Sequence, residues 1–256
     1  MAVGEKRSAK TRILVVDEHP LIRHGITTLI NGQPDMVICG EADGIPSAQS
    51  KLAECQPHLL VIGLRLGTGD TLEFIKTLKA QYPELLILVF SQCEETIFAE
   101  RALRAGANGY LMKHATGEEL LTAIRDIMCG EIYVSRKIAM LAFQKSLETP
   151  RQNHRQENGN ESGNLRDIKN LSDREMHVFQ LIGSGLGAAK IAEALNLSVK
   201  TIETHRENIK CKLGLRSAAE VAERATAWTN ESFLSPQKGE LSVVKKKRNV
   251  VPFRAA

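Results

Sequence analysis

Residues 13–25 read ILVVDEHPLIRHG, and this stretch decides the fold of the first half of the chain. Its four apolar residues, Ile13–Val16, are followed at once by the carboxylates of Asp17 and Glu18. Continuous apolarity, in place of strict alternation, is typical of a strand that is buried on both faces, as in a parallel sheet. The sequence therefore predicts a buried strand that ends in two acidic residues.

Four more apolar runs follow, and amphipathic stretches separate them. The runs are Met36–Cys39, Leu59–Ile62, Leu86–Phe90 and Tyr110–Met112. Helical patterns lie near residues 20–31, 46–55, 70–81, 95–105 and 117–129. Five strand–helix units in series predict an α/β domain over residues 12–130, with a doubly wound, five-stranded parallel sheet of the flavodoxin-like type. In such folds the chemistry lies beyond the carboxyl ends of the strands.

The rest of the chain predicts a linker, a second domain and a tail. Residues 131–170 combine a helix that begins near Ser135 with the polar stretch TPRQNHRQENGNESGN, which is typical of a flexible linker. Residues 171–230 show helical patterns again and predict an all-α domain. Residues 231–256 contain the basic run KKKR, and we expect this tail to be disordered.

Composition limits the class of protein. The chain has 256 residues, of which 43% are hydrophobic and 25% charged, as in a soluble globular protein with two ordinary domains. The net charge of +4 permits nucleic-acid binding without arguing for it. The five cysteines are scattered and lack zinc-site spacing, so we expect reduced thiols in a cytosol. Because the sequence shows no signal peptide and no run of about 20 apolar residues, we expect a cytoplasmic protein without membrane contact.

The second domain carries the signals of short helices joined by a tight turn. Ser172 and Glu175 form a capping box at the start of its first helix. A short helix is predicted over Ala188–Leu195, and Ser198 can cap the next one, over Val199–Leu213. Two short helices joined in this way form the helix-turn-helix pattern.

The last of these helices has two different faces. At about 100° per residue, Ile202, Ile209 and Leu213 share one face, which can pack on the preceding helix. The opposite face carries Lys200, Glu203, Thr204 and Glu207, with Arg206 and Lys210 at its flanks. A polar face with a basic rim suits the major groove of DNA, although an ordinary solvated helix face fits the pattern equally well.

This segment resembles the LuxR-type helix-turn-helix family. The matching stretches are LSDRE at 171–175, GL at 185–186, KIA at 190–192, LSVKTIETHR at 197–206 and KLG at 212–214. The resemblance implies that Val199–Leu213 is the recognition helix for double-stranded DNA, and that Ser217–Trp228 mediates a homodimer on paired half-sites. The implied DNA-contacting residues are Ser198, Lys200, Thr201, Glu203, Thr204, Arg206, Glu207 and Lys210. The implied dimerisation residues are Ala218, Val221, Ala222 and Ala225.

Two features temper this resemblance. Gly187 stands where the family often has a Ser or Thr cap, which weakens the start of the second helix. Glu203 and Glu207 keep the reading face from being strongly basic, because a carboxylate near phosphates is unfavourable unless it accepts a hydrogen bond. One module alone should therefore bind DNA weakly, so a dimer is the expected form.

In the first domain, polar residues follow three strands of the predicted sheet. Asp17 and Glu18 end the first strand, Ser91 follows the fourth and Lys113 follows the fifth. A carboxylate pair, a hydroxyl and a lysine are the parts needed to hold Mg²⁺ and a phosphoryl group. Taken one at a time, each of these residues is more often an ordinary loop residue.

Together these residues resemble the receiver domain of two-component response regulators, in particular the NarL/FixJ family. The matching motifs are ILVVDEHPLIRHG at 13–25, PHLLVIGLRL at 57–66 and AGANGYLMKHA at 105–115. The resemblance implies that Asp17 and Glu18 bind Mg²⁺, that Ser91 is the switch hydroxyl and that Lys113 pairs with phosphoryl oxygens.

The departure from the family lies at the end of the third strand, where the phospho-accepting aspartate is expected. That position is Gly63, which has no side chain and cannot form an acyl phosphate. Mg²⁺ binding is weakened as well, so we expect no cofactor, with Asp17 and Glu18 as the ligands if any metal binds. Asp70 is the nearest alternative acceptor. The retained residues are either structural, with Lys113 neutralising Asp17, or bind another ligand or partner.

The leading prediction is a sequence-specific, DNA-binding transcription regulator that aspartyl phosphorylation does not control. One alternative is a protein-interaction module that titrates a signalling partner, and another is a regulator phosphorylated at a non-standard residue. RNA polymerase or a signalling protein are conceivable further partners. A hydrolytic site at Asp17, Glu18 and Lys113 is disfavoured because no nucleophile–base pair stands out, so we expect no enzyme.

Overall fold

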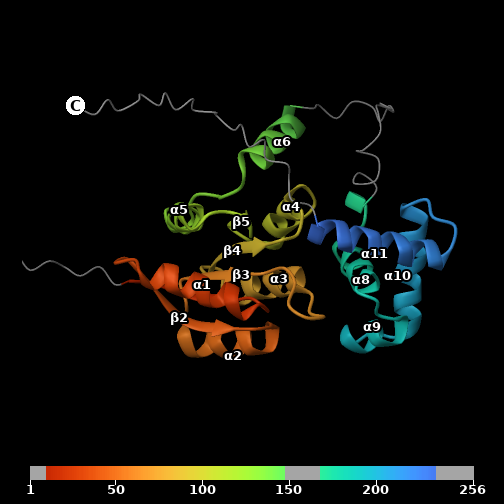
Figure 1. The fold of residues 1–256 in the computed structure, drawn as a ribbon, viewed down its shortest axis with the longest axis horizontal. Coiled ribbons are helices and arrows are strands. Elements are labelled where there is room, and N and C mark those ends of the chain that lie inside the picture. The colour runs from red at the N-terminus through yellow and green to blue at the C-terminus, as the bar shows by residue number, and fades with distance from the viewer. Residues whose placement is uncertain (1–9, 148–167, 235–256) are drawn as a thin grey trace, which may run out of the picture.

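A computed structural model describes residues 10–147 and 168–234 of the chain. Figure 1 shows an α/β domain beside a smaller helical domain. The strands are β1 (Thr11–Val16), β2 (Met36–Ala42), β3 (Leu59–Ile62), β4 (Leu86–Ser91) and β5 (Gly109–Met112). The helices that alternate with them are α1 (Pro20–Asn31), α2 (Ile45–Cys55), α3 (Thr71–Gln81), α4 (Glu95–Ala105) and α5 (Gly117–Met128).

The five strands form one parallel sheet in the order β2-β1-β3-β4-β5. Successive residues of β1 face opposite sides of it: Ile13 and Val15 pack with α1 and α5, whereas Leu14 and Val16 pack on the side of α2, α3 and α4. Both faces are covered, which is why the strands read as continuous apolar runs. The predicted doubly wound, five-stranded parallel sheet is confirmed.

The strand order decides where a site can form. The chain steps from β1 outward to β2 and then crosses back to β3 on the other side of β1. The carboxyl ends of β1 and β3 are therefore neighbours, and this reversal of strand order is where open α/β sheets form their clefts. It brings Asp17 beside Gly63.

Side-chain caps fix the starts of several helices. Asp70 Oδ1 accepts a hydrogen bond from the Glu73 backbone N–H at 3.2 Å and so begins α3. Ser172 and Glu175 form the predicted capping box, with the Ser172 backbone N–H 2.7 Å from Glu175 Oε2. Such caps satisfy the N–H groups that the first turn of a helix leaves without a partner.

The second half begins with α6 (Arg136–Leu147), whose side chains are mostly exposed, and continues into the helical domain. Its helices are α8 (Asp173–Gly183), α9 (Ala188–Ala194), α10 (Val199–Lys212) and α11 (Ala218–Leu234). Gly183 allows α8 and α11 to cross closely, because a Cβ there would collide with Ala225 and Thr229. Ile191, Ile202 and Ile209 are buried between the helices, as the predicted packing of α10 on α9 requires.

The end of the last helix differs from the sequence-based expectation, and two other expected segments cannot be compared with the structure. The last helix continues to Leu234, beyond both the expected helix end at Trp228 and the expected domain boundary at residue 230. The polar stretch at 149–164 and most of the expected tail lie outside the described residues. None of the helices in residues 10–147 and 168–234 is long and apolar enough to cross a membrane.

Candidate DNA-binding surface and receiver site

The predicted recognition helix is α10, and its start is fixed by Ser198. The Ser198 hydroxyl accepts a hydrogen bond from the Thr201 backbone N–H at 3.1 Å. From there the helix buries Ile202 and Ile209. The side chains on the opposite side are exposed to solvent: Lys200, Glu203, Thr204 and Glu207.

The charges on this face are paired along the helix. Arg206 NH1 lies 3.2 Å from Glu203 Oε1, and Lys210 Nζ lies 2.6 Å from Glu207 Oε1. These are pairs three residues apart on one helix, where ion pairs contribute only a few tenths of a kcal/mol. A DNA phosphate can therefore replace the carboxylate as the partner of Arg206 or Lys210 at a small cost in free energy. Arg206 Nε is buried without a hydrogen-bond partner, so this guanidinium keeps an unused donor.

The structure corrects part of the predicted dimerisation face on α11. Val221 is 1% exposed and Ala225 is 0% exposed, because α11 packs across α8 and turns these residues into the core of its own domain. They cannot also form a surface for a second copy. Ala218 is exposed and Ala222 is half-buried, so only these two remain available.

In the α/β domain, Asp17 and Lys113 meet at the carboxyl edge of the sheet. Lys113 Nζ lies 2.5 Å from Asp17 Oδ2, and both side chains are almost fully buried. The other oxygen, Asp17 Oδ1, accepts a hydrogen bond from the His19 backbone N–H at 2.9 Å and lies 3.0 Å from His19 Nδ1. Both oxygens of the carboxylate are therefore engaged within the protein.

The other two predicted site residues make separate contacts. Glu18 Oε2 accepts a hydrogen bond from the Gly67 backbone N–H at 3.1 Å and so holds the loop between β3 and α3. Ser91 is buried, and its hydroxyl accepts a hydrogen bond from the Cys93 backbone N–H at 3.1 Å. The structure thus joins Asp17 directly to Lys113 and directs Glu18 and Ser91 to neighbouring loops.

Gly63 follows β3 and faces Asp17, as the count along the sequence predicts. Its backbone N–H donates to the Val16 carbonyl at 2.9 Å. A Cβ at this position would lie 3.0 Å from Asp17 Oδ2. Residue 63 therefore points at the carboxylate that is already paired with Lys113.

A divalent cation does not fit this set of donors. Mg²⁺ needs oxygen ligands that are free to coordinate it. Both Asp17 oxygens have protein partners, Glu18 Oε2 accepts from a backbone N–H, and Gly63 supplies no oxygen. In residues 10–147 and 168–234 no group of three or more His, Cys, Asp or Glu side chains is placed to hold a metal ion.

Sequence reasoning missed the contacts of Tyr110 and Asp70. The sequence places Tyr110 in a strand, and the structure shows that its buried hydroxyl donates to the Cys93 carbonyl at 2.6 Å. Burial raises the pKa of Tyr110. Asp70, the nearest alternative acceptor, has Arg174 NH1 at 3.1 Å and His177 Nδ1 at 3.2 Å from its Oδ2 atom. In the sequence, Tyr110 shows only as an aromatic residue three positions before Lys113, and Asp70 only as an acidic residue before α3. Neither signal predicts the contacts of the side chain.

Comparison with known proteins agrees with both halves of this description. The profile of the response regulator receiver domain matches residues 13–125, and that of the luxR family of bacterial regulatory proteins matches residues 169–225. The oxygen regulatory protein NreC of Staphylococcus aureus (strain bovine RF122 / ET3-1) is 36% identical over 217 residues, which cover 84% of this chain and 96% of NreC. The chain belongs to the LuxR/NarL family of response regulators.

Solved structures show the same fold in a member of this family. RcsB of Salmonella typhimurium has a TM-score of 0.65 at 21% identity, and the match covers 85% of this chain and 98% of RcsB. RcsB bound to the promoter P1flhDC in the presence of a phosphomimetic also has a TM-score of 0.65, at 22% identity, with coverage of 85% and 99%. By its match to the luxR family and its likeness to NreC, this LuxR/NarL response regulator is a DNA-binding transcription regulator and not an enzyme.

Proposed function

We propose that this response regulator binds specific DNA sequences as a homodimer and that aspartyl phosphorylation of its receiver does not control it. DNA is the ligand named for RcsB, which was solved on promoter DNA and also as two dimers on two parallel DNAs. The exposed polar face of α10 supports the same ligand here, because a solvent-facing helix with replaceable charges fits a major groove.

Gly63 carries the second part of the proposal. A phosphoryl group needs a nucleophile at the end of β3, and glycine has none. The carboxylate that faces Gly63 is already paired as well, since Lys113 Nζ lies 2.5 Å from Asp17 Oδ2. A buried ion pair whose partners satisfy each other is a structural element, and it leaves neither charge available for a phosphoryl group.

A phosphodonor experiment tests this proposal. Wild-type protein incubated with Mg²⁺ and acetyl phosphate should acquire no hydroxylamine-sensitive phosphate, whereas Gly63→Asp should acquire some. A carboxylate at residue 63 supplies the nucleophile and the missing Mg²⁺ ligand, and beside Asp17 it competes for Lys113. The matched control is Thr68→Asp, which adds the same charge to the same loop at an exposed position. Phosphorylation of the wild type would refute the proposal.

The homodimer is tested on the outer side of α11. Ala218→Glu places a charge on an exposed position, so it should weaken binding to paired half-sites and leave both the fold and single half-site binding unchanged. Val221→Glu serves as the contrast, since it buries a carboxylate in the core and should unfold the helical domain. Paired-site affinity that is unaffected by Ala218→Glu would remove this face from the dimer.

The two alternatives fare differently. Phosphorylation at Asp70 is disfavoured, since Oδ1 caps α3 and Oδ2 contacts Arg174 and His177. A module that titrates a signalling partner has one supporting observation, because Met140, Phe143 and Leu147 of α6 are large apolar side chains exposed to solvent. Selection from random-sequence duplex DNA separates the two functions: enrichment of a defined site supports the regulator, and no enrichment supports the interaction module.

A further inference from the structure

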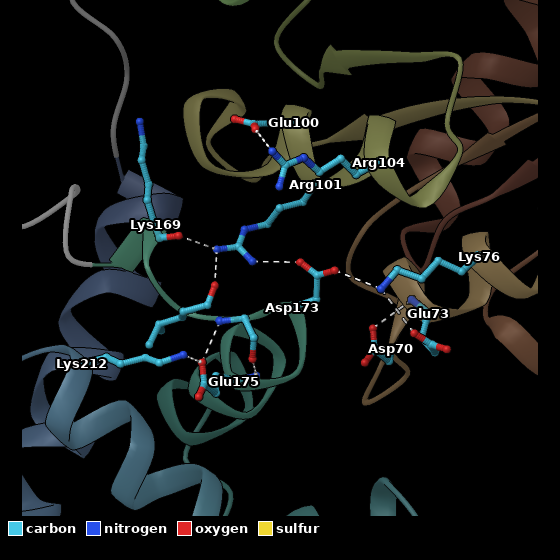
Figure 2. A network of polar contacts seen from close by, with 12 residues as sticks. Asp70, Glu73, Lys76, Glu100, Arg101, Arg104, Lys169, Asp173, Glu175 and Lys212 are labelled. Atoms are coloured by element: carbon cyan, nitrogen blue, oxygen red, sulfur yellow. Dashed lines mark hydrogen bonds and ion pairs between the residues drawn. The ribbon is translucent and has the colours of Figure 1, made fainter. Parts of the chain in front are cut away.

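The two domains are joined by a network of polar contacts centred on Asp173, the first residue of α8 (Figure 2). Its carboxylate lies 2.9 Å from Arg101 NH1 of α4 and 3.0 Å from Lys76 Nζ of α3. Arg101 NH2 donates in addition to the backbone carbonyls of Lys169 (3.0 Å) and Leu171 (2.5 Å). One guanidinium thus holds three acceptors around the start of α8, because its planar group carries several N–H donors.

A second polar contact lies beside this network at Asp70. This residue caps α3 and also reaches Arg174 NH1 of α8 at 3.1 Å. His177 Nδ1, one turn further along α8, lies 3.2 Å from the same oxygen, although not in line for a hydrogen bond. Burial raises the pKa of Asp70, but the contacts with His177, Glu73 N–H and Arg174 lower it to about 2, so the carboxylate stays charged at neutral pH.

An aromatic contact completes the boundary. Trp228, the one tryptophan of the chain, packs between the two domains. Its ring centroid lies 6.1 Å from that of Phe98 in α4 and 5.8 Å from that of Phe179 in α8. These distances are typical of favourable aromatic pairs, and all three rings are buried. The apolar cluster on the α2–α4 side of the sheet therefore continues into the helical domain.

The surfaces that the domains need for DNA lie away from this boundary. The contacts between domains come from α8, from the turn before it and from Trp228, while the reading side chains Lys200, Glu203 and Thr204 are exposed. Ala218, at the other end of α11 from Trp228, is exposed too. Docking on the receiver thus leaves the reading face and the remaining dimerisation position open.

We propose that Arg101, Asp173 and Asp70 are positioning residues for DNA binding, and that the docked arrangement is the form of the protein that binds DNA. In this view the receiver serves as a rigid support. It fixes the orientation of α8, and through α8 that of α10, so two copies that meet on paired half-sites have less freedom to lose. The inference does not depend on whether the receiver accepts a phosphoryl group.

Chemical cross-linking tests whether the docked form binds DNA. In a chain that carries Cys129→Ser and Cys211→Ser, which remove the exposed thiols, Lys76→Cys and Asp173→Cys are joined by a short bis-maleimide. Before cross-linking, this protein lacks the Asp173 carboxylate and should bind a selected paired-site duplex about tenfold more weakly than the same chain with Lys76 and Asp173 intact. The cross-link should restore its affinity to within about threefold of that chain, because the lock replaces the native contact. Affinity that falls further on cross-linking would show that the domains must separate and would overturn the proposal.

A pair of variants tests the positioning role. Arg101→Met keeps the apolar stem of the side chain and removes the contacts to Asp173, whereas Arg104→Met, on the same helix, removes an exposed arginine that pairs with Glu100. Arg101→Met should lower affinity for a paired-site duplex about tenfold and for a single half-site less than about twofold, because only the paired complex benefits from fixed domains. Arg104→Met should change neither affinity. Equal losses on both duplexes, unchanged paired-site affinity or tighter binding by Arg101→Met would each overturn the proposal.

Discussion

The ion pair at the receiver site and those on α10 have the same chemistry and opposite surroundings. Lys113 and Asp17 meet where their side chains are 8% and 3% exposed, whereas Glu203 and Glu207 on α10 are 54% and 61% exposed. A buried pair cannot lose one member without leaving an unpaired charge in a medium of low dielectric. A surface pair is screened by water and salt and exchanges partners readily.

This contrast supports the proposal that DNA binds at α10 and that the receiver pair has a structural role. In the receiver site Lys113 and Asp17 pair with each other across the ends of β5 and β1. On α10 the charges form weak pairs along one helix, where a phosphate can displace the carboxylate. Under the proposal, the same residue types are structural in one domain and available for binding in the other.

Breaking the buried pair should have the largest effect. Lys113→Met leaves Asp17 buried without its counter-ion and should lower the free energy of unfolding of the α/β domain by about 3–5 kcal/mol. Asp17→Asn combined with Lys113→Met removes both charges and should restore much of that loss. Urea denaturation followed by circular dichroism measures both values. A loss below about 1 kcal/mol in Lys113→Met would mean that solvent reaches the pair.

Changes on α10 should have smaller effects, and they should appear in DNA binding instead of stability. Glu203→Ala or Thr204→Ala should change the preference at single base positions by about 1–3 kcal/mol. Lys210→Ala should instead weaken binding to every sequence and reduce its salt dependence, because it removes a phosphate contact. Titrations on a selected duplex and its single-base variants, at several salt concentrations, distinguish the two behaviours. Unchanged specificity in a variant that lacks Lys200, Glu203, Thr204 and Glu207 side chains would exclude α10 as the reading helix.

The sequence predicts those features that depend on neighbours along the chain. The apolar runs that begin at Ile13 and Leu59 predict the parallel sheet, because a strand that is buried on both faces has no polar alternation. The position of Gly63 opposite Asp17 follows from counting along β3. Even the Lys113–Asp17 pair could be anticipated as one of two explanations, since both residues follow strands at the carboxyl edge of one sheet.

The sequence does not predict contacts that depend on which surfaces meet. Helical periodicity finds the small residues of α11 but does not tell which partner covers them, and so Val221 and Ala225 were assigned to a dimer although α8 covers them. The helical pattern over residues 95–105 gives no sign that Arg101 contacts the second domain. The hydrogen bond from the Gly67 N–H to Glu18 depends on the conformation of the loop after β3. Gly67 has a φ of 60° there, a conformation that glycine adopts easily and that the sequence does not reveal.

The smallest effect on stability should come from Asp70 at the domain boundary. Its side chain is 15% exposed, which lies between Asp17 and Glu203. The contacts of Asp70 lower its pKa in the folded protein from 3.8 to about 2. A carboxyl group whose pKa is lowered by folding stabilises the folded state above its ordinary pKa, and that contribution is lost as the pH falls through the folded value. Asp70→Asn keeps the cap of α3 and removes the charge, so it isolates this contribution.

The free energy of unfolding of the wild type should therefore exceed that of Asp70→Asn by up to about 1 kcal/mol at neutral pH, since solvent reaches the group and screens its partners. The difference should stay constant from pH 7 to pH 5 and should shrink as the pH falls below the ordinary pKa of 3.8 toward 2. Urea unfolding followed by the fluorescence of Trp228 measures it, because this residue lies at the same boundary. A difference that already changed between pH 7 and pH 5.5 would show that the titration of Asp70 alone does not account for it.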